Sequence, residues 1–178
     1  MNELNEFWTN SIAEAINKAR GEGRHDVADY LALKATNDEI RAAASRWLFE
    51  SALEIAHEAM RRGINLKIEN ENPHRFEANR ATMVGSLLRF KRGVRQLTAE
   101  AGWTRTPQDG FMRGNSLAAA RLTHFGQAKH NAGLLLLRPS DLPAAPPQWF
   151  AVDRAGNRAP FDSNSLRGHF AIFLGESL

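Results

Sequence analysis

Cysteine is absent from the 178 residues of this chain. Disulfide frameworks, thiol-based catalysis and cysteine-ligated zinc are therefore excluded. A chain of this length buries enough surface to form a core without a disulfide or a structural metal. The absence of cysteine fits a reducing compartment, and we expect a cytoplasmic protein.

Long hydrophobic runs are also missing. No apolar stretch approaches the ~20 residues that a membrane-spanning helix needs. Residues 1–6 do not combine a basic segment with an apolar one, as a signal peptide does. We therefore expect a soluble protein without a membrane partner.

The common signatures of catalysis and nucleotide binding are lacking as well. The sequence contains no glycine-rich dinucleotide or phosphate loop, no His-Glu-x-x-His, no Gly-x-Ser-x-Gly and no EF-hand loop. No stretch spaces several acidic residues as a metal-dependent nuclease does. We therefore predict no cofactor and no metal, identify no catalytic residue, and favour a protein that is not an enzyme.

Charge is distributed unevenly along the chain. Residues 1–74 carry nine Lys or Arg and thirteen Asp or Glu, whereas residues 75–138 carry eleven and three. Nine of these eleven central cations are arginine, the side chain best suited to bidentate contacts with anions. Acidic and basic segments thus follow one another within a chain whose net charge is only +3.

Apolar residues at spacings of three and four predict three N-terminal helices. The first covers residues 4–19, and a shorter one follows Gly23. The third begins at a capping box, Thr36-Asn37-Asp38-Glu39, and ends at Arg61-Arg62-Gly63. It is the longest of the three, so we expect the sheet to pack on it.

The period changes to two after Gly63, which indicates strands. We predict strands over residues 64–69, 80–91, 94–103, 117–125 and 132–138, with one more at 149–152. Residues 70–74 are interpreted as a turn, Arg92-Gly93 as a hairpin turn, and residues 104–115 as a long surface loop.

These elements predict an α+β fold. Three N-terminal helices, with a long third one, pack on an antiparallel sheet of five or six strands, and a C-terminal helix closes the structure. Residues 1–138 form a single domain, and residues 139–147, which hold four of the seven prolines, form a connector. Residues 148–178 supply a strand and a helix that dock on the main body or on a partner subunit.

The leading functional hypothesis is a binding module whose arginine-rich sheet engages an anionic partner, with nucleic acid as the first candidate. A competing interpretation is that the acidic helices simply neutralise the basic sheet, and this alternative stays open. The proposed anion-binding residues are Arg89, Arg92, Arg95, Arg105, Arg113 and Arg121.

Two other hypotheses come from different classes. A small-ligand protein or enzyme would place a pocket between the third helix and the sheet, around Trp103, Arg105, Glu100 and His124. A structural subunit would self-associate, as a possible homodimer, through its acidic and basic surfaces. His124 and His130 lie six residues apart, but a metal site needs further ligands, so we predict none.

Overall fold

The computed structural model describes residues 2–112, 114–139 and 145–176, with side chains from residue 9 onward. The chain divides into two compact units, Met1–Ala42 and Ala43–Leu178, named unit 1 and unit 2 here. Within the described residues, no helix is both long enough and apolar enough to cross a membrane.

Two helices precede the sheet: α1, Asn2–Gly21, and α2, His25–Arg61. Unit 1 consists of α1 and the first part of α2, joined by a short turn in which Gly23 has a positive φ of 72°. The rest of α2 belongs to unit 2. It ends as expected at Arg61, followed by Gly63 at φ 86°.

The prediction of three N-terminal helices is wrong, because the expected second and third helices form one 37-residue helix. Neither glycine nor proline occurs between Arg24 and Arg62, so nothing interrupts the backbone hydrogen bonds. The supposed capping box lies inside this helix. There, the Thr36 hydroxyl donates to the carbonyl of Ala32, and Asp38 pairs with Lys34 and Arg41.

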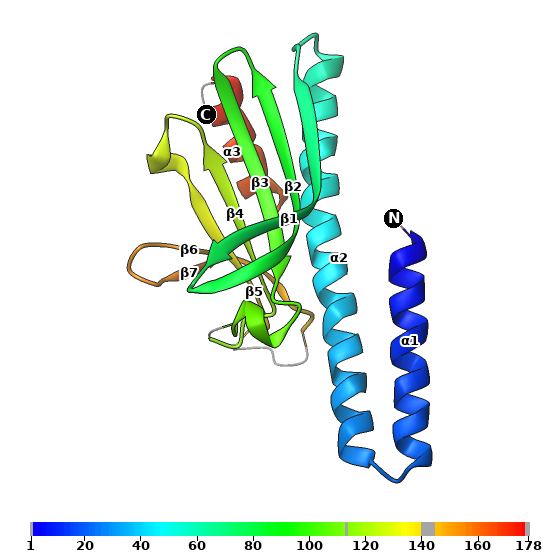
Figure 1. The fold of residues 1–178 in the computed structure, drawn as a ribbon. Helices are drawn as coiled ribbons and strands as arrows, with labels where there is room; N and C mark the ends of the chain where they lie inside the picture. The colour runs from blue at the N-terminus through cyan, green and yellow to red at the C-terminus, as the bar shows by residue number, and fades with distance from the viewer. Residues whose placement is uncertain (1, 113, 140–144, 177–178) are drawn as a thin grey trace. The chain divides into compact units, whose positions relative to one another are not determined.

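Unit 2 contains one antiparallel sheet in which strand order equals sequence order (Figure 1). Every strand therefore pairs with its neighbours along the chain. The strands are β1 Lys67–Ala78, β2 Ala81–Arg92, β3 Arg95–Trp103, β4 Ala118–His124, β5 Ala132–Leu137, β6 Gln148–Val152 and β7 Arg158–Pro160.

The sheet has seven strands, so the expectation of five or six is also wrong. The additional strand, β7, is only three residues long, and all of its residues are exposed. It was not predicted because it has no alternation of apolar and polar residues. The predicted turn at residues 70–74 lies within β1. Its pairing with β2 shifts register between Glu71 and His74, on either side of a cis Asn72–Pro73 bond.

The real turn between β1 and β2 is Asn79-Arg80, where both residues have positive φ. This geometry suits a two-residue hairpin, although the turn contains no glycine. The hairpin turn predicted after β2 is confirmed, because Arg92 pairs with Arg95 across Gly93.

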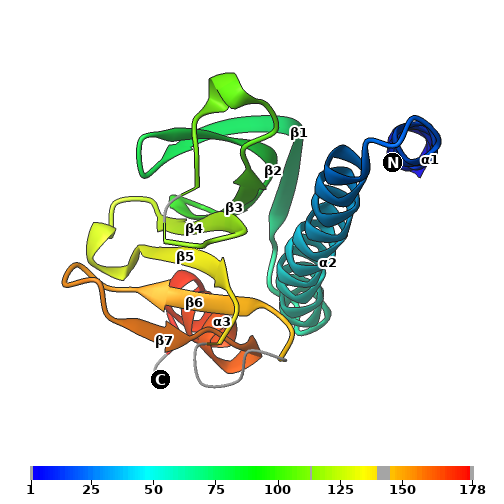
Figure 2. The ribbon, with the colours of Figure 1, turned by 90° about the horizontal axis from the view of Figure 1, so that it is seen from below.

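A C-terminal helix, α3 (Ser163–Leu174), lies along one face of the sheet (Figures 1 and 2). The Asp162 side chain caps it by accepting a hydrogen bond from the Ser165 amide at 2.8 Å. The Phe170 ring meets the Phe90 ring edge-on, with centroids 5.1 Å apart, and both residues are at most 1% exposed. This layer is the main core of unit 2.

The same face also contacts the part of α2 that belongs to unit 2. Trp149 of β6 is 2% exposed, and its indole N–H donates to the Ala44 carbonyl at 3.0 Å. A smaller apolar cluster, formed by Phe76, Ala81, Met83 and Ala119, is buried where the second half of β1 bends over the other face. The two faces of the sheet are therefore covered by different elements.

Candidate nucleic-acid interface

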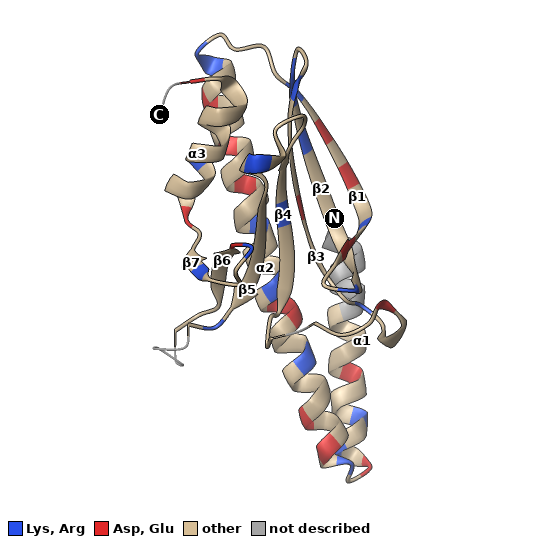
Figure 3. Ribbon diagram, turned by 90° about the vertical axis from the view of Figure 1, so that its left-hand side faces the viewer, with Lys and Arg blue, Asp and Glu red and all other residues tan. Residues whose placement is uncertain are grey.

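The lysines and arginines of the basic segment are spread over several strands of the sheet and the turns between them (Figure 3). Arg89 and Lys91 of β2 both pair with Glu69 of β1, at 3.1 and 2.9 Å. Hydrogen bonds from Lys91, Lys67 and Arg89 lower the pKa of Glu69 to about 2. These two cations are thus ion-paired within the sheet, where they share one carboxylate with Lys67.

Arg92 and Arg95 point to the C-terminal end of α3. Arg92 donates to the Leu174 carbonyl, and Arg95 donates to the Ile172 carbonyl at 3.2 Å and the Phe173 carbonyl at 3.4 Å. The last carbonyls of a helix have no partner within the helix and carry partial negative charge. Both arginines therefore have a structural role in holding α3.

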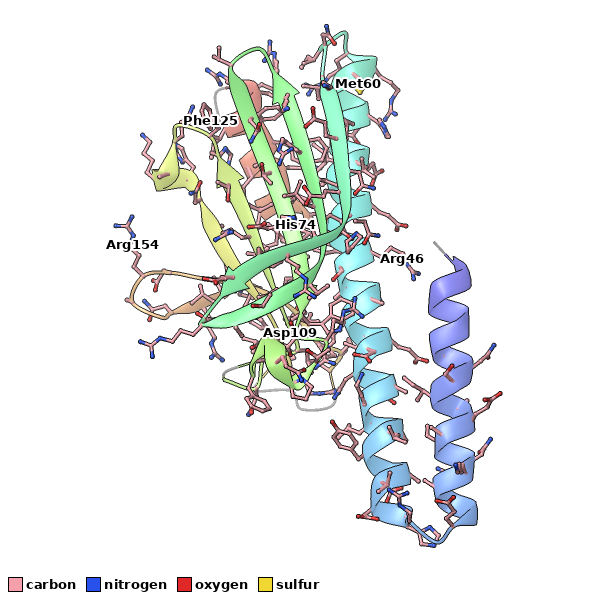
Figure 4. All side chains as sticks on the ribbon, viewed as in Figure 1. Arg46, Met60, His74, Asp109, Phe125 and Arg154 are labelled. Atoms are coloured by element: carbon pink, nitrogen blue, oxygen red, sulfur yellow. The ribbon has the colours of Figure 1, made fainter. Side chains whose placement is uncertain are left out.

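Arg121 of β4 lies directly opposite Glu100 of β3 and donates to its carboxylate at 2.6 Å. His74 of β1 completes a network, because its Nε2 is 2.7 Å from Glu100 and its Nδ1 is 3.0 Å from Glu71. Burial lowers the pKa of His74, but the hydrogen bonds to Glu71 and Glu100 outweigh it, so the pKa is raised. Figure 4 shows His74 where β1 bends.

The first part of the loop after β3 is organised around Asp109, which is labelled in Figure 4. Asp109 is the last residue of a short 3₁₀ helix, η1 (Pro107–Asp109). The carboxylate of Asp109 is 8% exposed and accepts from the backbone amides of Thr106 and Arg105, at 2.9 and 3.0 Å. These amides lower the pKa of Asp109. The loop therefore has a defined conformation.

Four residues in this loop or beside it are named the loop-end cluster: Arg75, Arg80, Arg105 and Phe111. Arg75 is 3.5 Å from the Asp109 carboxylate, and its side chain remains 68% exposed. Gly110 packs on the backbone at Arg80, since a Cβ there would lie 3.6 Å from the Arg80 carbonyl. Phe111 is 81% exposed.

Arg105 stacks on Trp103, with its guanidinium carbon 3.7 Å from the centre of the ring. Trp103 itself is 6% exposed, and its indole N–H has no hydrogen-bond partner among the described residues. Buried donors normally have a hydrogen-bond partner, so the indole N–H of Trp103 is an exception. Stacking on an aromatic ring also fixes the plane of the guanidinium.

Three histidines meet on the face that α3 covers. The Nε2 of His124 is 2.9 Å from the Nδ1 of His169, and the ring of His130 is 5.9 Å from that of His124. Burial and the neighbouring His169 and His130 lower the pKa of His124 to about 4. Over the described residues, no group of three or more potential ligands is arranged to hold a metal ion.

The pocket expected around Trp103, Glu100 and His124 is not assembled. Glu100 points to the opposite face from the other two, because side chains alternate along β3. His124 pairs with Leu97, six residues before Trp103, which places them roughly 20 Å apart along the strand. Only Trp103 and Arg105 are brought together.

A groove of about 700 Å³ does occur in unit 2, but between the end of α2 and α3. Two ion pairs join its walls, Arg167 with Glu58 at 2.7 Å and Arg62 with Glu176 at 3.1 Å. Its lining includes Ile55, Phe170 and Leu174 and none of the residues proposed from the sequence.

Among the proposed anion-binding residues, only Arg105 belongs to the loop-end cluster, and Arg113 lies outside the described residues. Arg75, Arg80 and Phe111 were not singled out, although each lies in the basic segment. The sequence contains no signal for their proximity, because it depends on the bend of β1. No protein-family model matches the chain, and no curated protein or solved structure is detectably similar to it.

Proposed function

We propose that the chain is a binding module for single-stranded nucleic acid and that the loop-end cluster is its binding surface. The observation that carries the proposal is the 81% exposure of Phe111 in the loop where Arg105 stacks on Trp103 and Arg75 pairs with Asp109. Guanidinium groups bind phosphates, and exposed aromatic rings stack on unpaired bases.

The charges of unit 2 support this proposal. Residues 43–178 carry eighteen Lys or Arg and twelve Asp or Glu, a net charge of +6. Net positive charge attracts polyanions from a distance and speeds association. Arg89 shares the Glu69 carboxylate at 3.1 Å and is 31% exposed, whereas Arg75 is 3.5 Å from Asp109 and 68% exposed.

Binding is tested by fluorescence anisotropy of labelled oligo(dT) and oligo(U) over a range of salt concentrations. We expect the triple variant Arg75→Gln, Arg80→Gln, Arg105→Gln to bind at least tenfold more weakly than wild type. The slope of log affinity against log salt should become shallower by roughly 2, at about 0.7 per lost phosphate contact.

A matched control removes three exposed cations elsewhere: Arg61→Gln, Lys129→Gln and Arg154→Gln. This variant has the same net charge, so it should lose less than threefold in affinity. Phe111→Ala should lose about 1–3 kcal/mol of binding free energy, because it removes one stacking platform. Equal losses in both triple variants, or no binding of wild type at low salt, would contradict the proposal.

Self-association is a second candidate, favoured by one observation in unit 1. Tyr30 and Leu33 lie three residues apart on α2 and are 65% and 60% exposed. Residues 1–42 carry five Lys or Arg and eight Asp or Glu, opposite in sign to unit 2. Light scattering of wild type and of Tyr30→Ser, Leu33→Ser tests this: a dimer that the variant converts to a monomer supports it, and a wild-type monomer rules it out.

A further inference from the structure

The three histidines of unit 2 come from three separate segments. His124 is the last residue of β4, His130 belongs to a short 3₁₀ helix, η2 (Ala128–His130), and His169 lies in the middle of α3. Only His124 and His169 are hydrogen-bonded to each other, so one of the two facing nitrogens carries the proton and donates the hydrogen bond that the other accepts. This arrangement requires the facing nitrogen of one ring to be unprotonated.

The surroundings of these rings provide no counter-charge. His124 is 4% exposed; across β3 it pairs with Leu97, and its backbone amide donates to the Asn131 side chain. The groups that face it are His130 from η2 and His169 from α3. Within the described residues, no carboxylate forms an ion pair or hydrogen bond with any of the three rings.

We propose that this histidine cluster is a pH-sensitive latch, which holds α3 against the sheet at neutral pH and releases it at mildly acidic pH. Protonation of both facing rings replaces a hydrogen bond with two like charges in a buried site. Release of α3 lets water solvate the charged rings, so acid favours the undocked state. It also exposes Leu166, Phe170 and Phe173, which are at most 2% exposed when docked.

The size of the pH effect on the docking of α3 follows from the linkage between docking and proton binding. The pKa of His124 is about 4 in the docked state, and in the undocked state it takes the ordinary value of a solvated histidine, about 6.5. The undocked state therefore binds more protons between these two values, and docking weakens as pH falls through that window. Between pH 7.5 and 5.0, His124 alone should shift the equilibrium toward release by roughly 30-fold. The lowered pKa of His169 acts in the same direction.

Hydrogen exchange measured by mass spectrometry at pH 7.5 and 5.0 tests the latch, after correction for the intrinsic pH dependence of exchange. In wild type, we expect the protection of peptides from α3 to fall by about 30-fold at pH 5.0, while peptides from β2 and β3 keep theirs. In His124→Leu, the protection of α3 should fall clearly less than in wild type, because His169 is then the remaining ring with a lowered pKa. His57→Leu, at an exposed position of α2, is the matched control and should behave as wild type.

If His124→Leu does not fold, His169→Gln carries the test, since it removes the second titrating ring at a half-buried position. It should show a smaller loss of α3 protection than wild type at pH 5.0. The latch is ruled out if α3 and the strands lose protection together, or if the variants that each lack one ring of the cluster retain the full wild-type response.

Discussion

Glu100 and Arg121 face each other on neighbouring strands and share a short ion pair that His74 closes from a third strand. Both oxygens of the Glu100 carboxylate are engaged, one by Arg121 and the other by His74. The network thus fastens the bent half of β1 to β3 and β4. Its Arg121 side chain is 48% exposed, whereas that of Glu100 is only 7% exposed.

Glu100→Gln should destabilise the protein, because the neutral amide cannot accept strong hydrogen bonds from both cations. We expect the free energy of unfolding to fall by about 1–3 kcal/mol in urea denaturation. Glu77→Gln, an exposed change on the same β1 strand, is the control and should stay within about 0.5 kcal/mol. Equal effects of the two changes would show that Glu100 has no special role.

The contribution of His74 to stability should depend on pH. Its pKa is raised in the folded state, so the folded protein binds the proton more tightly than the unfolded chain does. The contribution of His74 to stability is therefore complete below about pH 6.5, the pKa of an unperturbed histidine. It is lost as the pH rises through the raised pKa of the folded state. We expect the stability difference between wild type and His74→Gln, measured in urea, to shrink between pH 6 and 9. A constant difference would contradict this assignment.

Gly175→Ala should destabilise α3 for two reasons. Gly175 ends the helix at φ 71°, and a Cβ there would lie 2.5 Å from the Arg95 guanidinium, displacing it from the helix carbonyls. Gly156→Ala is the matched control, since its φ is 86° and nothing lies within 4 Å. The control should cost about 1–2 kcal/mol of backbone strain. Gly175→Ala should cost about 0.5–1.5 kcal/mol more, for the lost hydrogen bonds, in thermal or urea unfolding.

Small residues on the second part of α2 allow close packing. Ala52, Ala56 and Ala59 are fully buried. Ala56→Leu should therefore force the surrounding side chains apart and cost about 1–3 kcal/mol in urea denaturation. Ala43→Leu, at an exposed position of the same helix, should stay within about 0.5 kcal/mol. A neutral Ala56→Leu would show that this face has spare room.

The sequence predicted the antiparallel strands and the C-terminal end of α2 because glycine and alternation act locally. The continuity of α2 was missed because Thr36 and Asp38 suit either a helix start or a helix interior. The length of β1 was missed because Pro73 and its polar neighbours resemble a turn, while a register shift keeps them in the ladder.

The candidate site was less accessible from sequence. Whether an arginine is neutralised depends on strand register, which pairs Arg89 with Glu69 and Arg121 with Glu100. His169 lies 45 residues from His124, and only the docking of α3 brings the two together. Trp103 and Arg105 were named together because both belong to one short segment, but the sequence did not predict that they stack.

The strictly sequential sheet also has a consequence for folding during synthesis. Each strand finds its partner among residues that have just been made, so the sheet can extend hairpin by hairpin with short loop closures. The contact from Arg92 to the Leu174 carbonyl instead spans 82 residues. During synthesis the strands can therefore pair before α3 has been made, and the part of the sheet that α3 covers stays exposed until then.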